Sequence, residues 1–370
     1  MNNISIRSTL VLSILGALAI ALLIIVESSK SFKEQRYFKQ KMKAAGLAAK
    51  GMHHLKNTFF PDEIAIDNIN DPNNTGIIGQ QFSQLTSGRG SLPIKLSTTN
   101  PNFAAMIIEQ IKEAGLKEGD NVALCFTGSF PALNLAVCTA LETLKLKPIL
   151  VTSVTSSSWG ANDPNLTWLD MHKSLYEANV VSFLPRASSI GGNQDLGRTL
   201  SIEGRELAVN AIFRNGIPYI NEGSLEKSIA RRMEIFETES GDNVKLFINV
   251  GGGVASLGSN ANAKTLPSGF KQNAKLSDFP DKLGVLYEMT RKGVPTINLL
   301  NIGRLMSRYD LPRDPVPLPA IGEGLLYRAY KYDLPTVIVS TVVFLTLIIA
   351  VMYYDKKQNA LGTQIIKNHD

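Results

Sequence analysis

Cysteine and histidine are scarce in this chain, which has 370 residues but only two cysteines and four histidines. Cys125 lies in an apolar run and Cys138 in a helical pattern, so we expect both to be buried free thiols. These two cysteines do not define a cellular compartment. No spacing of cysteines and histidines matches a metal-ligand set, and the sequence therefore predicts no metal site.

Nucleotide-binding motifs are missing as well. No Gly-x-x-x-x-Gly-Lys sequence occurs, and Gly251-x-Gly253-x-x-Ser256 lacks the third glycine of the dinucleotide fingerprint. Ser129 lacks the flanking glycines of a nucleophile elbow. His172 is the only histidine within the regular pattern of strands and helices, which argues against a catalytic triad. We therefore predict no cofactor.

The net charge of +6 does not indicate a nucleic-acid partner. No RNA-binding or helix-turn-helix signature is present. Much of the positive excess lies just after the first apolar stretch, where attraction to anionic lipid is the simpler explanation. Membrane lipid is the partner that the charge pattern predicts, and no nucleic acid is expected.

Two uncharged apolar stretches lie at opposite ends of the chain, at residues 8–26 and 334–354. At about 1.5 Å per residue, each can cross a hydrocarbon core of about 30 Å. The first is long for the core of a cleaved signal peptide, and no small-x-small cleavage site follows it. We interpret both stretches as transmembrane helices, with a water-soluble domain between them.

The charges near these stretches favour a cytoplasmic domain. Six basic residues follow the first stretch, whereas only Arg7 precedes it: Lys30, Lys33, Arg36, Lys39, Lys41 and Lys43. Because basic residues near a membrane favour the cytoplasm, the sum places the domain there and both termini on the other side. A translocated domain behind an N-in signal anchor is the alternative.

The region between the two stretches divides into three parts. Residues 27–58 form a basic amphipathic juxtamembrane helix, residues 59–312 the α/β domain, and residues 313–333 a stiff proline-rich linker. Residues 355–370 are a polar tail.

Strands and helices alternate along the α/β domain. A strand at 121–126, a helix from Pro131 and a strand at 148–154 form a βαβ unit, which predicts a parallel sheet. Further strands are expected at 180–184, 219–220, 244–250 and 294–300, and residues 61–99 carry turn signals that predict an irregular segment. We predict an α/β fold with a mainly parallel sheet flanked by helices. Its ligand site should lie at the carboxyl ends of the strands.

Three segments are expected at these strand ends. In the first, Gly128 allows a sharp turn, and Ser129 offers a hydroxyl and a helix N-terminus suited to an anion. A structural N-cap is the alternative interpretation of Ser129. In the second, Ser158, Asn162 and Asp163 are polar, and Asp163 is a candidate general base. A plain loop in which Asn162 or Asp163 caps the next helix is the alternative.

The third segment combines glycines with arginines. Glycine lets the backbone approach a ligand closely, and arginine can clamp an oxyanion. The candidate ligand-binding residues in this set are Arg186, Gly191, Gly192, Arg198, Asn249, Gly251, Gly252 and Gly253. Ser129 and Asp163 are the candidate catalytic residues.

Several segments of the chain resemble the poly-gamma-glutamate system protein family, and the resemblance covers most of the α/β domain. The matching segments are Gly128-Ser-Phe-Pro-Ala-Leu-Asn-Leu-Ala136, Ser158-Trp-Gly-Ala-Asn-Asp-Pro164, Thr167-Trp-Leu-Asp170, Gly204-Arg205, Asn249-Val-Gly-Gly-Gly253 and Asp314-Pro-Val-Pro-Leu-Pro319. The resemblance implies a membrane-bound role beside the machinery that makes and exports poly-γ-glutamate. It assigns no catalytic residue to this chain.

Two functions of different classes follow from the sequence. The first is an accessory membrane component that binds or guides poly-γ-glutamate or organises the membrane-bound synthase. The second is a hydrolase or transferase that acts on γ-glutamyl or phosphorylated material through Ser129, Asp163 and the arginines.

Overall fold

A computed structural model describes residues 8–62 and 66–367, which divide into two units. The first unit comprises the chain up to Gln35 and from Arg328 onward, and the second is Arg36–Tyr327. Arg7 and residues 368–370 of the predicted tail lie outside the described residues.

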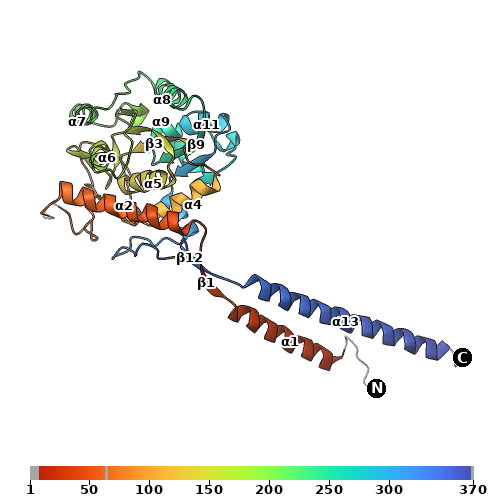
Figure 1. Ribbon diagram of the computed structural model, residues 1–370. Helices are drawn as coiled ribbons and strands as arrows, with labels where there is room; N and C mark the ends of the chain where they lie inside the picture. The colour runs from red at the N-terminus through yellow and green to blue at the C-terminus, as the bar shows by residue number, and fades with distance from the viewer. Residues whose placement is uncertain (1–7, 63–65, 368–370) are drawn as a thin grey trace. The chain divides into compact units, whose positions relative to one another are not determined.

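The first unit contains the two apolar helices, α1 (Thr9–Ser28) and α13 (Leu334–Lys367). They lie side by side, and β1 (Ser31–Glu34) pairs antiparallel with β12 (Arg328–Lys331) (Figure 1). Thr9–Ser28 and Leu334–Gln358 are long and apolar enough to cross a membrane. The expected pair of long apolar helices at the termini is therefore confirmed. The side on which the second unit lies stays a prediction, and a reporter fused after Asp370 that gave a cytoplasmic signal would contradict it.

The second unit is built on a six-stranded sheet with the order β10-β11-β9-β3-β4-β8. All neighbouring strands are parallel except β10 and β11. The strands are β3 (Asn121–Thr127), β4 (Lys147–Ser153), β8 (Ala187–Ser189), β9 (Val244–Val250), β10 (Gly269–Lys271) and β11 (Thr296–Leu299). The predicted α/β fold with a mainly parallel sheet is confirmed.

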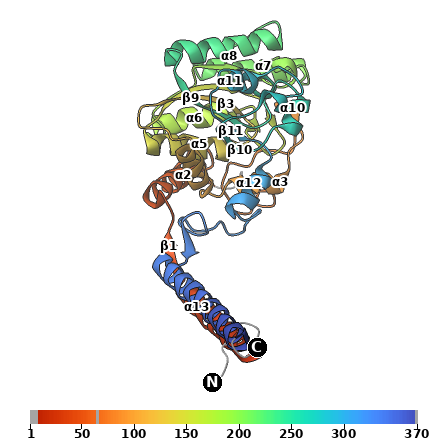
Figure 2. The ribbon, with the colours of Figure 1, turned by 90° about the vertical axis from the view of Figure 1, so that its right-hand side faces the viewer.

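Helices cover both faces of this sheet (Figures 1 and 2). One face packs against α2 (Phe38–Phe59), α4 (Phe103–Glu113), α5 (Pro131–Leu144) and α6 (Trp168–Glu177), and the other against α8 (Leu225–Ser240) and α11 (Val285–Arg291). Along β3, Leu124 and Phe126 belong to the first core, and Ala123 and Cys125 to the second. Because both faces are buried, the strand is apolar along nearly its whole length.

The remaining elements are short or lie at the edges of the sheet. They are β2 (Thr86–Gly88), α3 (Leu92–Thr98), β5 (Ser156–Ser157), β6 (Asn162–Asp163), β7 (Leu166–Thr167), η1 (Asn193–Asp195), α7 (Ile202–Arg214), α9 (Val254–Leu257), α10 (Asn260–Thr265), η2 (Leu276–Asp278) and α12 (Ile302–Tyr309).

The connections run in opposite directions from the centre of the sheet. From β3 the chain passes through α5 to β4 on one side, and from β9 it passes through α11 to β11 on the other. The direction of winding therefore reverses between the neighbouring strands β3 and β9. In open α/β sheets, ligands bind beyond the carboxyl ends of the strands at such a switch point.

Three local expectations differ from the structure. The predicted strand at 180–184 is wrong, because this stretch is irregular and the strand is Ala187–Ser189. Residues 61–99 contain the helix α3, whereas the turn signals predicted an irregular segment. Tyr219 forms only an isolated bridge with Ser188.

The stretch predicted as a juxtamembrane helix contains α2, which belongs to the second unit. Its Ala44, Ala45 and Ala48 are buried against α4 and α5, because small side chains allow helices to approach closely. Lys41 is only 1% exposed, forms an ion pair with Glu109, and donates a hydrogen bond to the carbonyl of Leu326.

The proline-rich segment is attached to the second unit at its beginning. The backbone N–H of Asp314 donates to Ser97 Oγ at 2.8 Å, and Asn73 Nδ2 donates to the carbonyl of Pro315 at 2.8 Å. Residues 314 and 315 are therefore held by the α/β unit rather than extended as a free linker.

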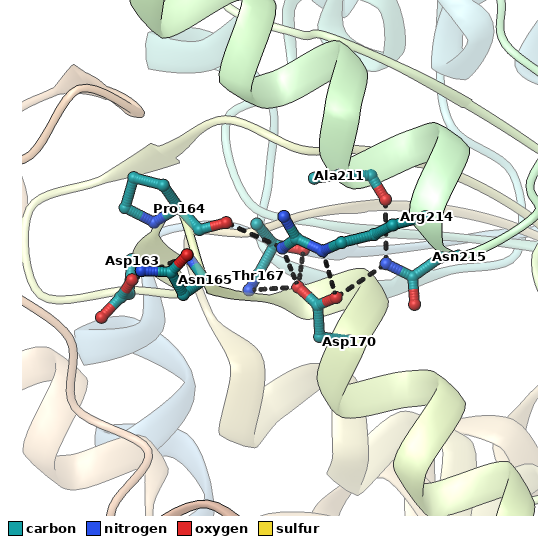
Figure 3. A network of polar contacts seen from close by, with 8 residues as sticks. All are labelled: Asp163, Pro164, Asn165, Thr167, Asp170, Ala211, Arg214 and Asn215. Carbon is teal, nitrogen blue, oxygen red and sulfur yellow. Dashed lines mark hydrogen bonds and ion pairs between the residues drawn. The ribbon is translucent and has the colours of Figure 1, made fainter.

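A polar network joins α6 to α7 (Figure 3). Asp170 accepts hydrogen bonds from the backbone and hydroxyl of Thr167, from Asn215 Nδ2, and from Nε and Nη2 of Arg214. Burial opposes ionisation of Asp170, but the hydrogen bonds from Arg214, Thr167 and Asn215 together hold its pKa below the usual value. Asp163 lies beside this network and accepts only the N–H of Asn165, at 2.8 Å, among the described residues.

Asp170→Ala should destabilise the folded chain by about 1–3 kcal/mol, because Thr167, Arg214 and Asn215 all lose their shared acceptor. Asp163→Ala is the matched control and should change stability by less than about 0.5 kcal/mol. Thermal unfolding of the detergent-solubilised protein, followed by the fluorescence of its two tryptophans, measures both effects. Equal effects of the two substitutions would contradict this account of the network.

Candidate functional site

The switch point brings together the ends of β3 and β9. Gly251 has a φ of +89°, and a side chain there would overlap Thr127 Oγ1. At Gly253, a Cβ would lie 2.9 Å from Thr127 Cγ2. Gly252 is exposed, and a Cβ there would meet no atom within 4 Å. The predicted glycines 251–253 therefore pack against the Thr127–Ser129 turn, and Gly252 is the exposed member of the three.

Ser129 does not cap the helix that follows it. The N-cap of α5 is Phe130, and no side chain makes a cap hydrogen bond there. The N–H of Ser129 donates to Thr127 Oγ1 at 3.2 Å, and its Oγ accepts the N–H of Ser157 at 3.1 Å. The Ser129 hydroxyl therefore links the first predicted segment to the second.

Glycines allow these two loops to stack closely. A Cβ at Gly128 would lie 2.7 Å from the carbonyl oxygen of Val154, and a Cβ at Gly160 would lie 2.6 Å from that of Gly128. Neither distance is compatible with a side chain. The sequence therefore needs glycine at both positions to bring Ser129 next to Ser157.

A buried lysine lies beneath the junction of these loops. Lys95 of α3 is 2% exposed, contacts the carbonyl oxygen of Ser129, and lies 2.9 Å from Ser157 Oγ. Its Nζ is 4.0 Å from the centre of the Phe130 ring. Among the described residues, no carboxylate pairs with Lys95. Burial lowers the pKa of Lys95 from its ordinary value to about 7.

Sequence reasoning missed Lys95. Its only signal is a lysine between Ile94 and Leu96 in a segment with turn residues nearby, and such lysines are usually exposed. The burial arises from α3 packing beneath two loops that are distant in the sequence.

The loop after β8 contributes Asp195 to a buried charge pair with Arg232 of α8. Asp195 Oδ2 lies 2.9 Å from Arg232 Nη1, and both side chains are less than 5% exposed. Ser189 and Ser228 donate to the two carboxylate oxygens of Asp195. Arg232 also donates to both of these hydroxyls. Asp195 reaches this position from a left-handed backbone conformation with a φ of +62°.

This ion pair is closed to ligands larger than water. It lines a cavity of about 10 Å³ together with Thr127, Asn249 and Gly253. A cavity of this size admits at most one water molecule. Because each charge is also paired and hydrogen-bonded, we assign the pair a structural role at the strand ends.

Three predicted residues serve local structure. Asn162 is buried, its Oδ1 accepts the backbone N–H of Gln80, and its Nδ2 donates to the carbonyl of Gln80. Asn249 Nδ2 donates to the carbonyl of Gly251 and to Asn298 Oδ1. Ser158 is buried near the carbonyl of Gly88.

Asp163 lies on the wall of a cleft of about 360 Å³, with Trp159 and Gly160, away from the Ser157 hydroxyl that Lys95 contacts. Its carboxylate forms the local turn with Asn165 described above. The structure therefore does not bring the two candidate catalytic residues, Ser129 and Asp163, into contact with each other.

The remaining candidates lie at both ends of the strand β8. Gly191 packs at the carboxyl end, where a side chain would lie 2.5 Å from Thr155 Oγ1. Gly192 and the exposed Arg198 are in the same loop. Arg186 precedes β8 and so lies at its amino end, where it pairs with Glu239 at 3.1 Å. The expectation that Arg186 joins the other segments is wrong, because the strand begins after it rather than before it.

Both cysteines are buried and free, as expected, and burial raises the pKa of Cys125 to about 12. Within the described residues, no group of three or more histidine, cysteine, aspartate and glutamate side chains could hold a metal ion. Comparison with protein-family models, curated proteins and solved structures finds no match to this chain. The site is therefore interpreted from its own geometry.

Lys95→Met should stabilise the chain most at pH values below about 7. The pKa of Lys95 is about 7 in the folded protein, against an ordinary value of 10.5. Between these values the unfolded chain binds a proton that the folded chain does not, so wild-type stability rises with pH in this window. Below it both states are protonated and the cost of burying the cation is complete. The gain from Lys95→Met should reach a few kcal/mol there and shrink toward pH 10.5.

Thermal unfolding of both proteins across this pH range measures the difference. Lys145→Met is the matched control, because the Lys145 side chain is 67% exposed and pairs with Glu118 at the surface. A gain for Lys95→Met that is the same at every pH would show that Lys95 keeps its ordinary pKa.

Proposed function

We propose that this protein is a membrane-anchored accessory component of a poly-γ-glutamate synthesis or export system. Its strand-end site would bind or guide the polymer, or a carboxylate-bearing part of the synthase. The family resemblance supplies the pathway. The observation that carries the binding role is the exposed backbone of Gly252 at the switch point, beside the Thr127–Ser129 turn.

The chemistry of this edge suits carboxylates. The N-terminus of α5 follows the turn directly, and its unpaired N–H groups and helix dipole favour negative charge. Gly252 is exposed between β9 and α9, so its backbone is accessible to a ligand. Arg198 is exposed on the loop that follows the carboxyl end of β8. Poly-γ-glutamate is a polyanion, and one face with N–H donors and a cation fits such a chain.

The two apolar helices, which precede and follow the α/β unit in the sequence, fit the same proposal. A protein anchored at both ends stays at the membrane where the polymer is made. A hydrolase or transferase is the second candidate function, and the contact between Lys95 and Ser157 favours it.

The pathway is tested by deleting the gene in a host that makes poly-γ-glutamate. The amount or chain length of the γ-linked polymer, measured inside cells and on their surface, should change, and the intact gene should restore it. An unchanged polymer would remove the protein from this pathway.

Direct polymer binding is tested with two arginine variants of the full chain in detergent. Binding of γ-linked polyglutamate should weaken as salt is raised, because surface charge interactions are screened. Arg198→Ala should weaken it about threefold, the size of one exposed charge contact. Arg186→Ala is the matched control, since it removes an arginine from the amino end of β8 rather than the carboxyl end, and it should leave binding unchanged. No binding at low ionic strength would leave only a role in organising partners.

A further inference from the structure

The buried amine of Lys95 lies where it can accept the proton of the Ser157 hydroxyl. A neutral lysine has two N–H donors and one lone pair. The carbonyl of Ser129 can only accept, so it takes one N–H, and the face of the Phe130 ring takes the second. The lone pair then remains for the Ser157 hydroxyl, whose Oγ is 2.9 Å from Nζ. Every hydrogen-bonding position of the neutral amine is used.

We propose that Ser157 and Lys95 form a nucleophile and general-base pair that catalyses acyl transfer from an amide or ester carbonyl. Serine and lysine form such pairs in hydrolases that lack a catalytic histidine. This inference goes beyond the proposed binding role and does not rest on the poly-γ-glutamate pathway.

Access and isolation support this assignment. Ser157 is half-buried, whereas Lys95 is almost fully buried, so a substrate can reach the hydroxyl while the amine is shielded from bulk solvent. Gly90 lies beside Ser157, and a Cβ there would be 3.2 Å from Ser157 Oγ. A Cβ there would also lie 2.3 Å from the carbonyl oxygen of Ser158, so glycine is needed for the backbone to pack this closely against Ser157 and Lys95.

A purely structural role explains Lys95 poorly. Burying a cation without a carboxylate is costly, and an apolar side chain of similar length would fill the same space. The chain instead keeps an amine in a site that lowers its pKa to about 7. Buried lysines with lowered pKa values act as bases and nucleophiles near neutral pH.

The reaction runs through an acyl-enzyme ester. Ser157 Oγ attacks the carbonyl carbon, and its proton passes to Lys95 Nζ. The bond from the carbonyl carbon to the leaving nitrogen or oxygen breaks, and the leaving group takes the proton from Lys95. Water then attacks the ester with Lys95 again as base, which releases a carboxylic acid and restores the Ser157 hydroxyl. An amine in place of water gives a new amide.

Ser129 is a positioning residue in this arrangement. Its Oγ accepts the N–H of Ser157, and its carbonyl holds Lys95. Ser129→Ala should therefore slow the reaction less than loss of either Ser157 or Lys95.

The test is covalent labelling of the full chain in detergent with a biotin-linked fluorophosphonate. The serine oxygen forms a bond to phosphorus, and fluoride leaves. We expect the label on Ser157, located by mass spectrometry of peptides, and none in Ser157→Ala. Lys95→Met should slow labelling about a hundredfold, and Lys95→Arg should not rescue it, because arginine keeps the charge but is no base. Ser87→Ala is the matched control on the paired strand β2 and should label at the wild-type rate.

The wild-type protein provides a second readout that needs no variant. Its labelling rate should fall about tenfold for each pH unit below the pKa of Lys95, because only the neutral amine acts as a base. A rate that does not depend on pH between about 5 and 8 would overturn the proposal. So would a folded protein in which Ser157 stays unlabelled, or a label on Ser129 instead. Because the readout is a covalent bond and not polymer binding, failure of the proposed pathway leaves it unaffected.

Discussion

The close approach of two loops at the carboxyl ends of β3 and β4 is the constraint on which the site depends. Gly128 and Gly160 leave no room for a side chain between the loops, and a Cβ at Gly79 would overlap the carbonyl oxygen of Gly160. This stacking brings the Ser129 hydroxyl to the Ser157 backbone and turns the Ser129 carbonyl toward Lys95. A methyl group at any of these glycines would separate the groups that form the proposed pair.

The buried cations of the α/β unit are neutralised in different ways, which separates structural from chemical roles. Arg232 is matched by Asp195 and two serine hydroxyls, so its charge is fully compensated beneath the strand ends. Lys41 has Glu109 and a carbonyl. Lys95 alone among these three meets only neutral acceptors and a ring, so no carboxylate offsets the burial that lowers its pKa. Proteins commonly keep a destabilising residue of this kind where it serves function.

The parts of the fold that follow from local pattern could be predicted from the sequence. The apolar run of β3, the glycine turn after it and the Gly251–Gly253 run identified a parallel sheet with its site at the strand ends. Burial that depends on distant segments could not be predicted. Residues 38–59 are basic and amphipathic, which suits a membrane surface as well as a protein core, and only the packing of Ala44 and Ala48 distinguishes the two. Lys95 gives no sequence signal because its environment comes from three separate segments.

The two proposed roles meet at Ser129. Its Cβ lies at the β9 glycines, where a Cβ on Gly251 would be 3.7 Å away, and its Oγ and carbonyl hold Ser157 and Lys95. A γ-linked polyglutamate chain carries a free carboxylate and an amide carbonyl in every unit. Carboxylates held at the helix N-terminus and glycines would place amide groups along the same edge as the Ser157 hydroxyl. Binding and acyl transfer are therefore compatible on one substrate, although each depends on different atoms and can exist without the other.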